Sequence, residues 1–473
     1  MKRCLVWFRR DLRLQDNPAL EAAVRSGAEI LPVYIHGESQ PAQLSEGGAS
    51  QWWLHHALSN LDEQLQGLGA GLHLVKTEEV VEKVCALVRE FKIETVFWNR
   101  RYQPMAIELD KEVKKHLLTE GVEVKSFNGS VLNEPHTISN QSGKPYQVFT
   151  PYWKCCQKIE VSAVGQVDFS VVKWIKAKGS TLKQLQLLPE IPWDKDFYKN
   201  WKPTRNEALH RLKGFTKQSV NEYNDERDMM AHDGTSKMAP YLHFGQIGVR
   251  EIYHHLKNAG EKVMNGYVRQ LYWRDFAHHL IYHFPHSVKR SLRPEYQQFP
   301  WSYSEKMLEA WKKGQTGYPI IDAAMRQLWQ TGWMHNRARM VVGSFLVKHL
   351  LQDWRSGADW FWDTLVDADL PNNTMGWQWV AGSGADAAPY FRVFNPLLQA
   401  EKFDRQGDYV RKYVPELASI PGKAIHAPWE LSEMELLSYG VQLGKTYPER
   451  MIDLHEGRDR ALDAYKKFKQ LNQ

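Results

Sequence analysis

A chain of 473 residues exceeds the usual size of one domain, so we expect at least two domains with a sizeable core. The formal charge of +6 permits a basic face for nucleic acid but does not require one. Four cysteines without a CxxC pair or zinc-type Cys/His spacing argue against a disulfide scaffold and against a bound metal. Because no apolar run suits a signal peptide or a membrane span, we expect a cytoplasmic protein with no membrane association.

The first 130 residues alternate short β-rich runs with helical patterns, which is typical of a parallel sheet with crossover helices. We therefore predict a Rossmann-like α/β domain over residues 1–130, with a parallel five-stranded sheet. The segment Gln51–Gln66 has the apolar stripe of an amphipathic helix that faces the core. The five predicted strands are Cys4–Phe8, Ile30–Ile35, Leu72–Val75, Thr95–Trp98 and Val122–Phe127.

A nicotinamide-binding domain would carry GxGxxG directly after its first strand, because glycines let the backbone approach a pyrophosphate. Here that position reads WFRRDLR, from Trp7 to Arg13. The absence of these glycines argues against ordinary dinucleotide binding.

Residues 131–205 are rich in turn signals and proline, which predicts a long connector with little regular structure. Helical patterns dominate residues 206–473, so the second domain is predicted to be all-α. No internal repeat or low-complexity tract suggests a solenoid or a disordered scaffold. The clearest helical segments are Val249–Leu256, Val268–Tyr282, Ile320–Leu351 and Arg458–Leu471.

The stretch from Gly332 to Pro396 mixes several tryptophans with charged residues, which indicates electron transfer beside a charged cofactor. If GWMHNRARM is helical, Asn336 and Met340 lie one turn apart on one face with Arg339 beside them. One helix could then line one pocket.

Four segments, WFRRDLRLQDN, GWMHNRARM, DTLVDADLPNNTMGWQW and DAAPYFRVFNP, closely resemble the DNA photolyase/cryptochrome family, and bacterial cyclobutane pyrimidine dimer photolyases most of all. The resemblance implies a carbon–carbon lyase that repairs pyrimidine dimers in DNA by electron transfer from excited, reduced FAD. It also implies that the α/β domain holds an antenna chromophore, for which methenyltetrahydrofolate is favoured over deazaflavin or FMN. The segment Trp98–Tyr102 falls where the family shapes that pocket, although solvated arginines at a strand end would look the same.

The resemblance assigns one FAD-binding segment to a hydroxyl-rich helix start, where backbone N–H groups suit phosphate oxygens. An ordinary helix cap would give the same Thr-Ser pattern. Ala239 departs from the family, which usually has a hydroxyl residue there, so one contact is in doubt. The residues of this segment are Tyr223, Thr235, Ser236, Lys237, Met238 and Ala239.

Further FAD contacts follow from the same resemblance, with Arg339 and Asp367 expected as a pair beside the flavin ring. A purely structural salt bridge is the alternative. Asn373 corresponds to the residue facing flavin N5, where many plant signalling homologues have Asp, and so favours repair. The full set is Gln270, Arg274, Asn336, Arg339, Asp367, Asp369 and Asn373.

Trp301, Trp354 and Trp377 occupy the family positions of an electron relay between the flavin and the surface. Indole rings can be oxidised transiently, which suits stepwise transfer. Without the family resemblance, a tryptophan at any one of these sites is more often explained by core packing, so the relay rests on all three aligning in order. With Asn373 and Gln270, these three complete the predicted catalytic residues.

The resemblance places a pyrimidine dimer in a pocket of polar and aromatic side chains, because photolyases are a known example of enzymes that flip their target out of the duplex. Phosphate contacts would position the strand without reading its sequence. The pocket residues are Gln270, Trp273, Asn336, Met340 and Trp379, and the phosphate contacts are Arg337, Arg392 and Lys402. Arg227, which resembles part of the FAD-binding segment, is also assigned to DNA binding.

Gln270 is a departure from the family, because dimer photolyases usually carry Glu there. Gln occurs in enzymes for the 6-4 photoproduct, but those need a histidine pair where this chain has Asn336 and Met340. The predicted substrate is therefore the cyclobutane dimer, in single- or double-stranded DNA, with reduced efficiency or a compensating contact.

Two other functions fit parts of the pattern. A cryptochrome-type blue-light photoreceptor would use the same flavin pocket without repair, and a non-enzymatic DNA-binding protein would hold a structural flavin. Asn336, Met340 and Asn373 favour repair over signalling, and the ordered tryptophans argue against a structural flavin. We expect the protein to act as a monomer.

Overall fold

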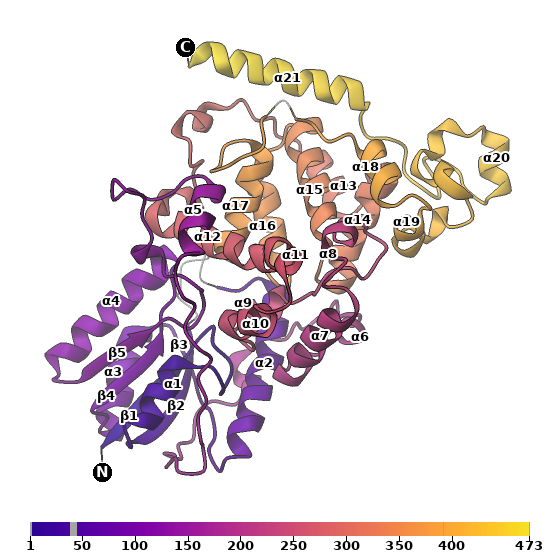
Figure 1. Ribbon diagram of the computed structural model, residues 1–473. Helices are drawn as coiled ribbons and strands as arrows, with labels where there is room; N and C mark the ends of the chain where they lie inside the picture. The colour runs from indigo at the N-terminus through magenta and orange to yellow at the C-terminus, as the bar shows by residue number, and fades with distance from the viewer. Residues whose placement is uncertain (1, 38–44, 391, 473) are drawn as a thin grey trace. The chain divides into compact units, whose positions relative to one another are not determined.

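The computed structural model describes residues 2–37, 45–390 and 392–472 of the chain (Figure 1). The chain divides into two compact units. Unit 1 comprises Met1–Asn221, Ser236–Pro285 and Val366–Pro371, and unit 2 comprises Glu222–Thr235, His286–Leu365 and Asn372–Gln473. The domain boundaries at residues 130 and 205 stay a prediction. Within the described ranges, no helix combines the length and the apolar character needed to cross a bilayer.

The N-terminal part of unit 1 is a five-stranded parallel sheet with the order β3-β2-β1-β4-β5, which confirms the predicted α/β fold. The central strand β1 is buried along almost its whole length, as expected for a parallel sheet covered on both faces. The predicted strand positions are right to within two residues at each end. The strands are β1 (Arg3–Phe8), β2 (Glu29–Gly37), β3 (His73–Thr77), β4 (Thr95–Asn99) and β5 (Glu123–Phe127).

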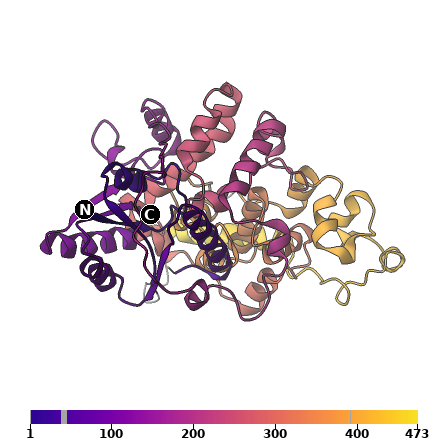
Figure 2. The same cartoon turned by 90° about the horizontal axis from the view of Figure 1, so that it is seen from below.

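Helices cover both faces of this sheet (Figures 1 and 2). Helices α3 (Val80–Phe91) and α4 (Pro104–Thr119) share one apolar core with alternate strand residues such as Leu5 and Trp7. Helix α1 (Pro18–Arg25) packs on β1, β4 and β5. Helix α2 (Gly48–Gln66) buries the apolar stripe that its sequence predicts.

The segment after the sheet has little regular structure, as predicted, and runs beside the sheet. Backbone hydrogen bonds join Ile30 to Lys173 and Ile175, and Leu74 to Ser180. Its short helices are η1 (Pro135–Thr137), α5 (Phe149–Cys156), η2 (Leu182–Leu185) and α6 (Phe197–Asn200). Unit 1 also contains α7 (Arg205–Gln218), α9 (Ala239–His243), α10 (Val249–Leu256), α11 (Glu261–Val263), η3 (Met264–Val268) and α12 (Arg269–His283).

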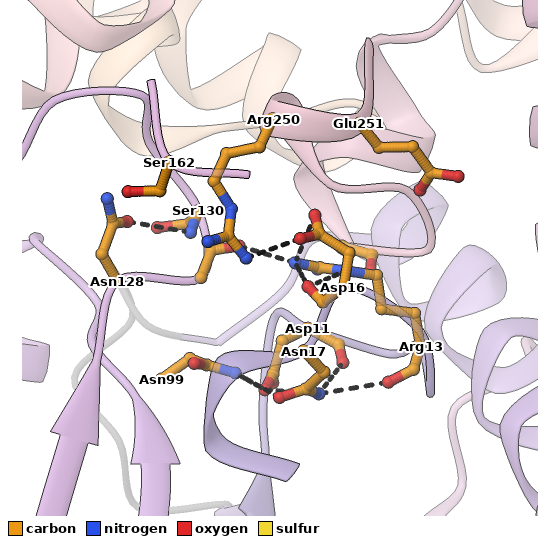
Figure 3. A network of polar contacts seen from close by, with 12 residues as sticks. Asp11, Arg13, Asp16, Asn17, Asn99, Asn128, Ser130, Ser162, Arg250 and Glu251 are labelled. Atoms are coloured by element: carbon orange, nitrogen blue, oxygen red, sulfur yellow. Dashed lines mark hydrogen bonds and ion pairs between the residues drawn. The ribbon is translucent and has the colours of Figure 1, made fainter. Parts of the chain in front are cut away.

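A buried polar network ties the carboxyl end of β1 to helix α10 (Figure 3). The Arg13 guanidinium donates to the backbone oxygens of Asp16, Gly129 and Gly245. The Asp16 carboxylate lies 2.5 Å from Arg250 and 3.7 Å from Arg13. Because Arg13 and Asp16 are almost completely buried, the network depends on their mutual charge compensation.

Unit 2 is helical throughout, as predicted. Its elements before residue 350 are α8 (Tyr223–Glu226), η5 (Pro294–Gln298), α13 (Glu305–Lys312), α14 (Pro319–Thr331), α15 (Asn336–Ser344) and η6 (Phe345–His349). The short helix η4 (Pro285–Val288) begins at the border of the unit. They are followed by α16 (Trp354–Thr364), α17 (Leu370–Ala381), α18 (Pro396–Phe403), α19 (Asp408–Tyr413), η7 (Pro415–Leu417), η8 (Gly422–His426), η9 (Pro428–Glu430), α20 (Glu433–Ser438) and α21 (Leu454–Leu471).

The helical pattern of Ile320–Leu351 is interrupted rather than continuous. Helix α14 ends where Gly332 adopts a left-handed conformation with φ of 65°. The Thr331 hydroxyl accepts from the backbone N–H of Trp333, and the chain re-enters a helix at Asn336. Because of this interruption, helix α15 begins at Asn336, one of the predicted pocket residues.

Helix α21, yellow in Figures 1 and 2, packs against η6. Beside this contact, Lys348 is almost fully buried, with its Nζ donating to the backbone oxygen of Tyr390 at 2.6 Å. Burial lowers the pKa of Lys348 to about 7. An unfolded lysine has a pKa of about 10.4, so between these two values the unfolded chain binds the extra proton.

This buried amine predicts a pH-dependent stability. The free-energy cost of burying the charged Lys348 is complete below pH 7. It declines as the pH rises toward the pKa of an unfolded lysine, because the amine is then neutral in both the folded and the unfolded chain. We expect Lys348→Met to raise Tm relative to the parent at pH 7, and the gain to shrink by about pH 10. Thermal melts across this range test it, with the exposed Lys306→Met as control. A gain that is independent of pH would contradict the expectation.

Candidate functional site

Unit 1 contains a polar cavity at the carboxyl ends of β1 and β4, where parallel sheets commonly bind ligands. We call it the histidine cavity. Helices α9 and α12 contribute its histidines, and Asp369 contributes a carboxylate from a distant part of the sequence. The charged and histidine side chains of its lining include Arg10, Arg100, Arg101, His243, Arg274, His278 and Asp369.

A chain of polar contacts crosses this cavity. Asp369 Oδ2 lies 3.5 Å from His243 Nδ1, and His243 Nε2 lies 2.7 Å from Arg10 Nη1. Burial lowers the pKa of His243 to about 4, and the nearby Arg10 acts in the same direction, so the ring is neutral at pH 7. Because Arg10 can only donate, His243 Nε2 accepts and its proton resides on Nδ1, facing Asp369.

Arg274, a predicted residue, and His278 from the same helix also line the cavity. Arg274 Nη1 donates to the backbone oxygen of Ser130 at 2.5 Å. Burial lowers the pKa of His278 to about 4. Burial alone would raise the pKa of Asp369, but His278, His243 and Arg274 hold it well below its usual range. The structure thus brings Arg274 and Asp369 to one cavity with an ionised carboxylate.

A second cavity lies between β1, β2 and α4 in the same unit, and we call it the arginine cavity. Arg9 pairs with Asp110, and Arg10 Nη2 lies 2.5 Å from Glu46. Among the described residues, no hydrogen-bond partner exists for the buried Nε of Arg101. Burial lowers the pKa of Arg101 to about 10, with Arg10 and Arg9 adding repulsion. A cationic wall of this kind suits an anionic ligand.

The predicted phosphate segment is a tight turn before α9. In unit 1, Lys237 adopts a left-handed φ of 51°, and Ser236 Oγ accepts from Met238 N and from the Tyr267 hydroxyl. Ala239, the first residue of α9, is exposed. In unit 2, Thr235 is half-buried and Tyr223 is buried, with the Arg227 guanidinium 5.3 Å from the Tyr223 ring centroid.

The predicted relay tryptophans lie in successive parts of unit 2. Trp377 packs so closely on α16 that a Cβ at Gly357 would lie 2.1 Å from its ring, and Trp354 is one turn earlier on the same helix. Ser302, adjacent to Trp301, bonds to Leu351 just before that helix. Trp354 and Trp377 are buried, whereas Trp301 is half-buried, which suits a path that ends at the surface.

Trp377 also has aromatic neighbours that sequence reasoning missed. Its ring centroid lies 5.0 Å from Phe361 and 6.2 Å from Trp311. Trp311 is fully buried, and its Nε1 donates to the backbone oxygen of Val342. The α13 sequence around Trp311 has only an ordinary amphipathic pattern, so nothing in it indicated this contact.

Helix α15 has the predicted arrangement of Asn336 and Met340, whose Nδ2 and Sδ atoms lie 3.9 Å apart. Arg339 Nε donates to the backbone oxygen of Met334. Arg337 pairs with Asp228 at 2.6 Å, so part of its charge is compensated within unit 2. Asn373 Nδ2 donates to the backbone oxygen of Ala358, which fixes its amide.

The other predicted pocket residues are placed as follows. In unit 1, Gln270 is half-buried and its Nε2 donates to the backbone oxygen of Gly266, while Trp273 stacks on Phe149 with centroids 3.6 Å apart. One face of the Trp273 ring is therefore occupied by protein. Asp367, also in unit 1, is buried. In unit 2, Trp379 is half-buried, and Arg392 and Lys402 are exposed.

Comparisons with known proteins agree with this architecture. Residues 4–168 match the family described as DNA photolyase, and residues 267–467 match the FAD binding domain of DNA photolyase. The chain is 44% identical to a deoxyribodipyrimidine photo-lyase of Agrobacterium fabrum, covering 98% of this chain and 97% of the relative. It is 35% identical to Cryptochrome-2 of Arabidopsis thaliana, covering 97% of this chain and 78% of the relative.

A solved structure of a bacterial class III photolyase from Agrobacterium tumefaciens superimposes with a TM-score of 0.95 at 43% identity, covering 99% of this chain and 98% of that one. The matched regions include the sheet and the helical part that carries the predicted flavin residues from Gln270 to Asn373. The chain therefore belongs to the DNA photolyase/cryptochrome family.

Proposed function

We propose that this protein is a deoxyribodipyrimidine photo-lyase, a lyase that uses light to split cyclobutane pyrimidine dimers in DNA. The observation that carries this function is the 44% identity to a photo-lyase over 98% of the chain. The fold agrees, since a class III photolyase superimposes over nearly all residues.

The residues present fit FAD. The ionised Asp369, neutral His243 and the Arg274 guanidinium give the histidine cavity a lining that suits a polar ligand, and Ser236 with the turn at Lys237 suits phosphate oxygens. We assign the cofactor to Tyr223, Thr235, Ser236, Lys237, Met238, Ala239, Gln270, Arg274, Asn336, Arg339, Asp367, Asp369 and Asn373. Bound FAD, when reduced and excited by light, supplies one electron to the dimer and recovers it after bond cleavage.

The tryptophans supply electrons to this site. Trp377 and Trp354 are buried indoles on adjoining helices, and half-buried Trp301 gives access to reductants in solution. Among the described residues, the indole Nε1 atoms of Trp354 and Trp377 have no hydrogen-bond partner, so no hydrogen bond from the indole group holds either ring. Asn373 places an uncharged amide at the flavin, with its orientation held by Ala358.

Damaged DNA is the proposed partner. Asn336 and Gln270 hold the pyrimidine carbonyls, Met340 packs on the bases, and Trp273 and Trp379 form apolar walls. The exposed Arg392 and Lys402 contact phosphates, joined by Arg227 and Arg337. Since Arg337 is paired with Asp228, it contributes less to the salt dependence of binding than Arg392 and Lys402 do.

A cryptochrome-type photoreceptor is the second candidate, because the chain also resembles plant cryptochromes. Asn373 and the 44% identity to the Agrobacterium fabrum photo-lyase, against 35% to Cryptochrome-2, favour repair. Loss of thymine dimers from irradiated DNA under blue light, with a dark control, separates the two. We expect repair only in the illuminated sample, and intact dimers in both samples would favour the photoreceptor.

The arginine cavity is the proposed antenna site, with methenyltetrahydrofolate favoured over deazaflavin or FMN. The incompletely bonded Arg101 beside Arg9 and Arg10 suits the carboxylates of a folate. Absorption and mass spectra of chromophores released from the purified protein identify the antenna. Recovery of a deazaflavin or FMN in place of folate would contradict the preference.

We further propose a monomeric protein of the cytoplasm. Its four cysteines are unpaired thiols, and three of them are buried. This state suits a reducing compartment.

Gln270 gives a direct prediction for repair. It stands where dimer photolyases usually carry Glu, and an amide cannot supply a proton to the developing charge on the pyrimidine. We expect Gln270→Glu to raise the quantum yield of repair by about two-fold or more while dimer binding changes less. Repair under single-turnover illumination, alongside binding of dimer DNA, measures both. An unchanged or lower yield would show that the site has another compensating contact.

A further inference from the structure

Two arginines, Arg10 and Arg101, line both cavities of unit 1. Of these, Arg10 has different partners on its two terminal nitrogens, with Nη1 on His243 and Nη2 on Glu46. Its charge also lies 4.7 Å from the Phe244 ring centroid, which restricts the plane of the group. An anion that enters the arginine cavity therefore meets the same group that donates to His243.

His243 lies between Arg10 and Asp369, with one ring nitrogen facing each of them. The residue is buried and neutral, so the donation from Arg10 to Nε2 keeps the proton on Nδ1, 3.5 Å from the carboxylate. A weaker donation from Arg10 permits the other tautomer, in which Nδ1 would present a lone pair to Asp369 instead of a proton. Through Arg10 and His243, Asp369 is thus sensitive to a charge placed in the arginine cavity, which Asp369 does not line.

We propose that Arg10 and His243 couple occupancy of the arginine cavity by an anionic ligand to the hydrogen bonding of Asp369, and hence to the redox state of the flavin. His243 is then a positioning residue for Asp369, and Arg10 sets its tautomer. This coupling rests on the proposed function, because Asp369 is assigned to FAD. The two sites must influence each other equally, since a coupling free energy between binding events is reciprocal.

The reciprocity supplies a test on the FAD-loaded protein. The Kd of methenyltetrahydrofolate is measured by fluorescence with the flavin oxidised and again with it chemically reduced in the dark. We expect the two values to differ by about five-fold or more. The same folate should shift the midpoint potential of the flavin in the matching direction. Inorganic phosphate, added as a second probe, shows whether the anionic charge alone is sufficient.

Variants at His243 separate its two contacts. His243→Phe removes both and should reduce the difference in Kd to less than about two-fold. His243→Asn retains a donor toward Asp369 without the ring acceptor for Arg10, so it should keep a flavin absorption spectrum near the parent's while losing the coupling. Arg205→Lys is the matched control, because Arg205 is a half-buried arginine of unit 1 that bonds to Glu251 and to the backbone oxygen of Gln246 and lines neither cavity. It should retain the coupling.

Equal Kd values in the two redox states of the parent protein would overturn the proposal, as would full coupling in His243→Phe. Failure of both probes to bind would overturn it too. Dimer repair by the same preparations is the independent check on function. Active repair without coupling refutes only the role of Arg10 and His243, whereas absent repair refutes the proposed function itself.

Discussion

Trp377→Phe is expected to slow light-driven reduction of the bound FAD by about ten-fold or more. Phenylalanine keeps the aromatic packing against Phe361 and Gly357 but is much harder to oxidise than indole. If Trp377 is the relay member nearest the flavin, the entire path passes through it. The absorbance of oxidised FAD, followed under blue light with an excess of thiol, measures the rate.

Repair by the chemically reduced variant distinguishes electron supply from damage to the site. That activity should remain near the parent's, because dimer splitting returns its electron and consumes none. Trp311→Phe is the matched control, since Trp311 is a buried indole in contact with Trp377 but outside the predicted series. An unchanged rate of photoreduction in Trp377→Phe would show that Trp377 does not carry electrons to the flavin. An equally slow rate in Trp311→Phe would show that Trp311 belongs to the electron path.

Gly357 provides an independent probe of the same geometry. A Cβ there would lie within 2.6 Å of three Trp377 ring atoms, so the ring must move when Gly357 is replaced by Ala. The indole remains oxidisable, but its position relative to α16 changes. A slower photoreduction in Gly357→Ala would therefore show that the placement of Trp377 matters as well as its chemistry.

The sheet and the helical second part could be predicted from the sequence because they depend on local periodicity. The alternation of short Val- and Ile-containing runs with amphipathic stretches located all five strands, and turn signals located the irregular segment. The break after α14 could have been found from Gly332, a residue that often ends a helix, but the apolar pattern on both sides concealed it.

The polar chain through His243 could not be predicted in this way. Arg10 and His243 are separated by 233 positions, and neither belongs to a motif that assigns them to each other. Asp369 comes from yet another segment, and its neighbours are set by tertiary packing. The family resemblance identified individual residues such as Arg274 and Asp369, whereas the neutral histidine between Arg10 and Asp369 required coordinates.

Asp16→Asn is expected to cost about 3–5 kcal/mol of folding free energy, the usual result of removing one partner of a buried ion pair. Arg13 and Asp16 are almost fully buried, and the carboxylate also holds Arg250 at 2.5 Å. Asp16 has a left-handed φ of 52°, a conformation that Asn adopts readily, so the substitution removes charge without new backbone strain. Urea unfolding followed by circular dichroism gives the difference in stability.

Glu120→Gln is the matched control, because it also removes one carboxylate from a 2.5 Å pair with arginine, but on the surface. Water solvates the remaining Arg89, so its unfolding midpoint should stay at the parent's value. In Asp16→Asn, by contrast, water cannot solvate the buried Arg13. Its N–H groups still donate to backbone oxygens inside the protein, but its charge has lost the carboxylate with which it was paired. Equal midpoints for Asp16→Asn and Glu120→Gln would mean that those backbone oxygens suffice to stabilise a buried guanidinium.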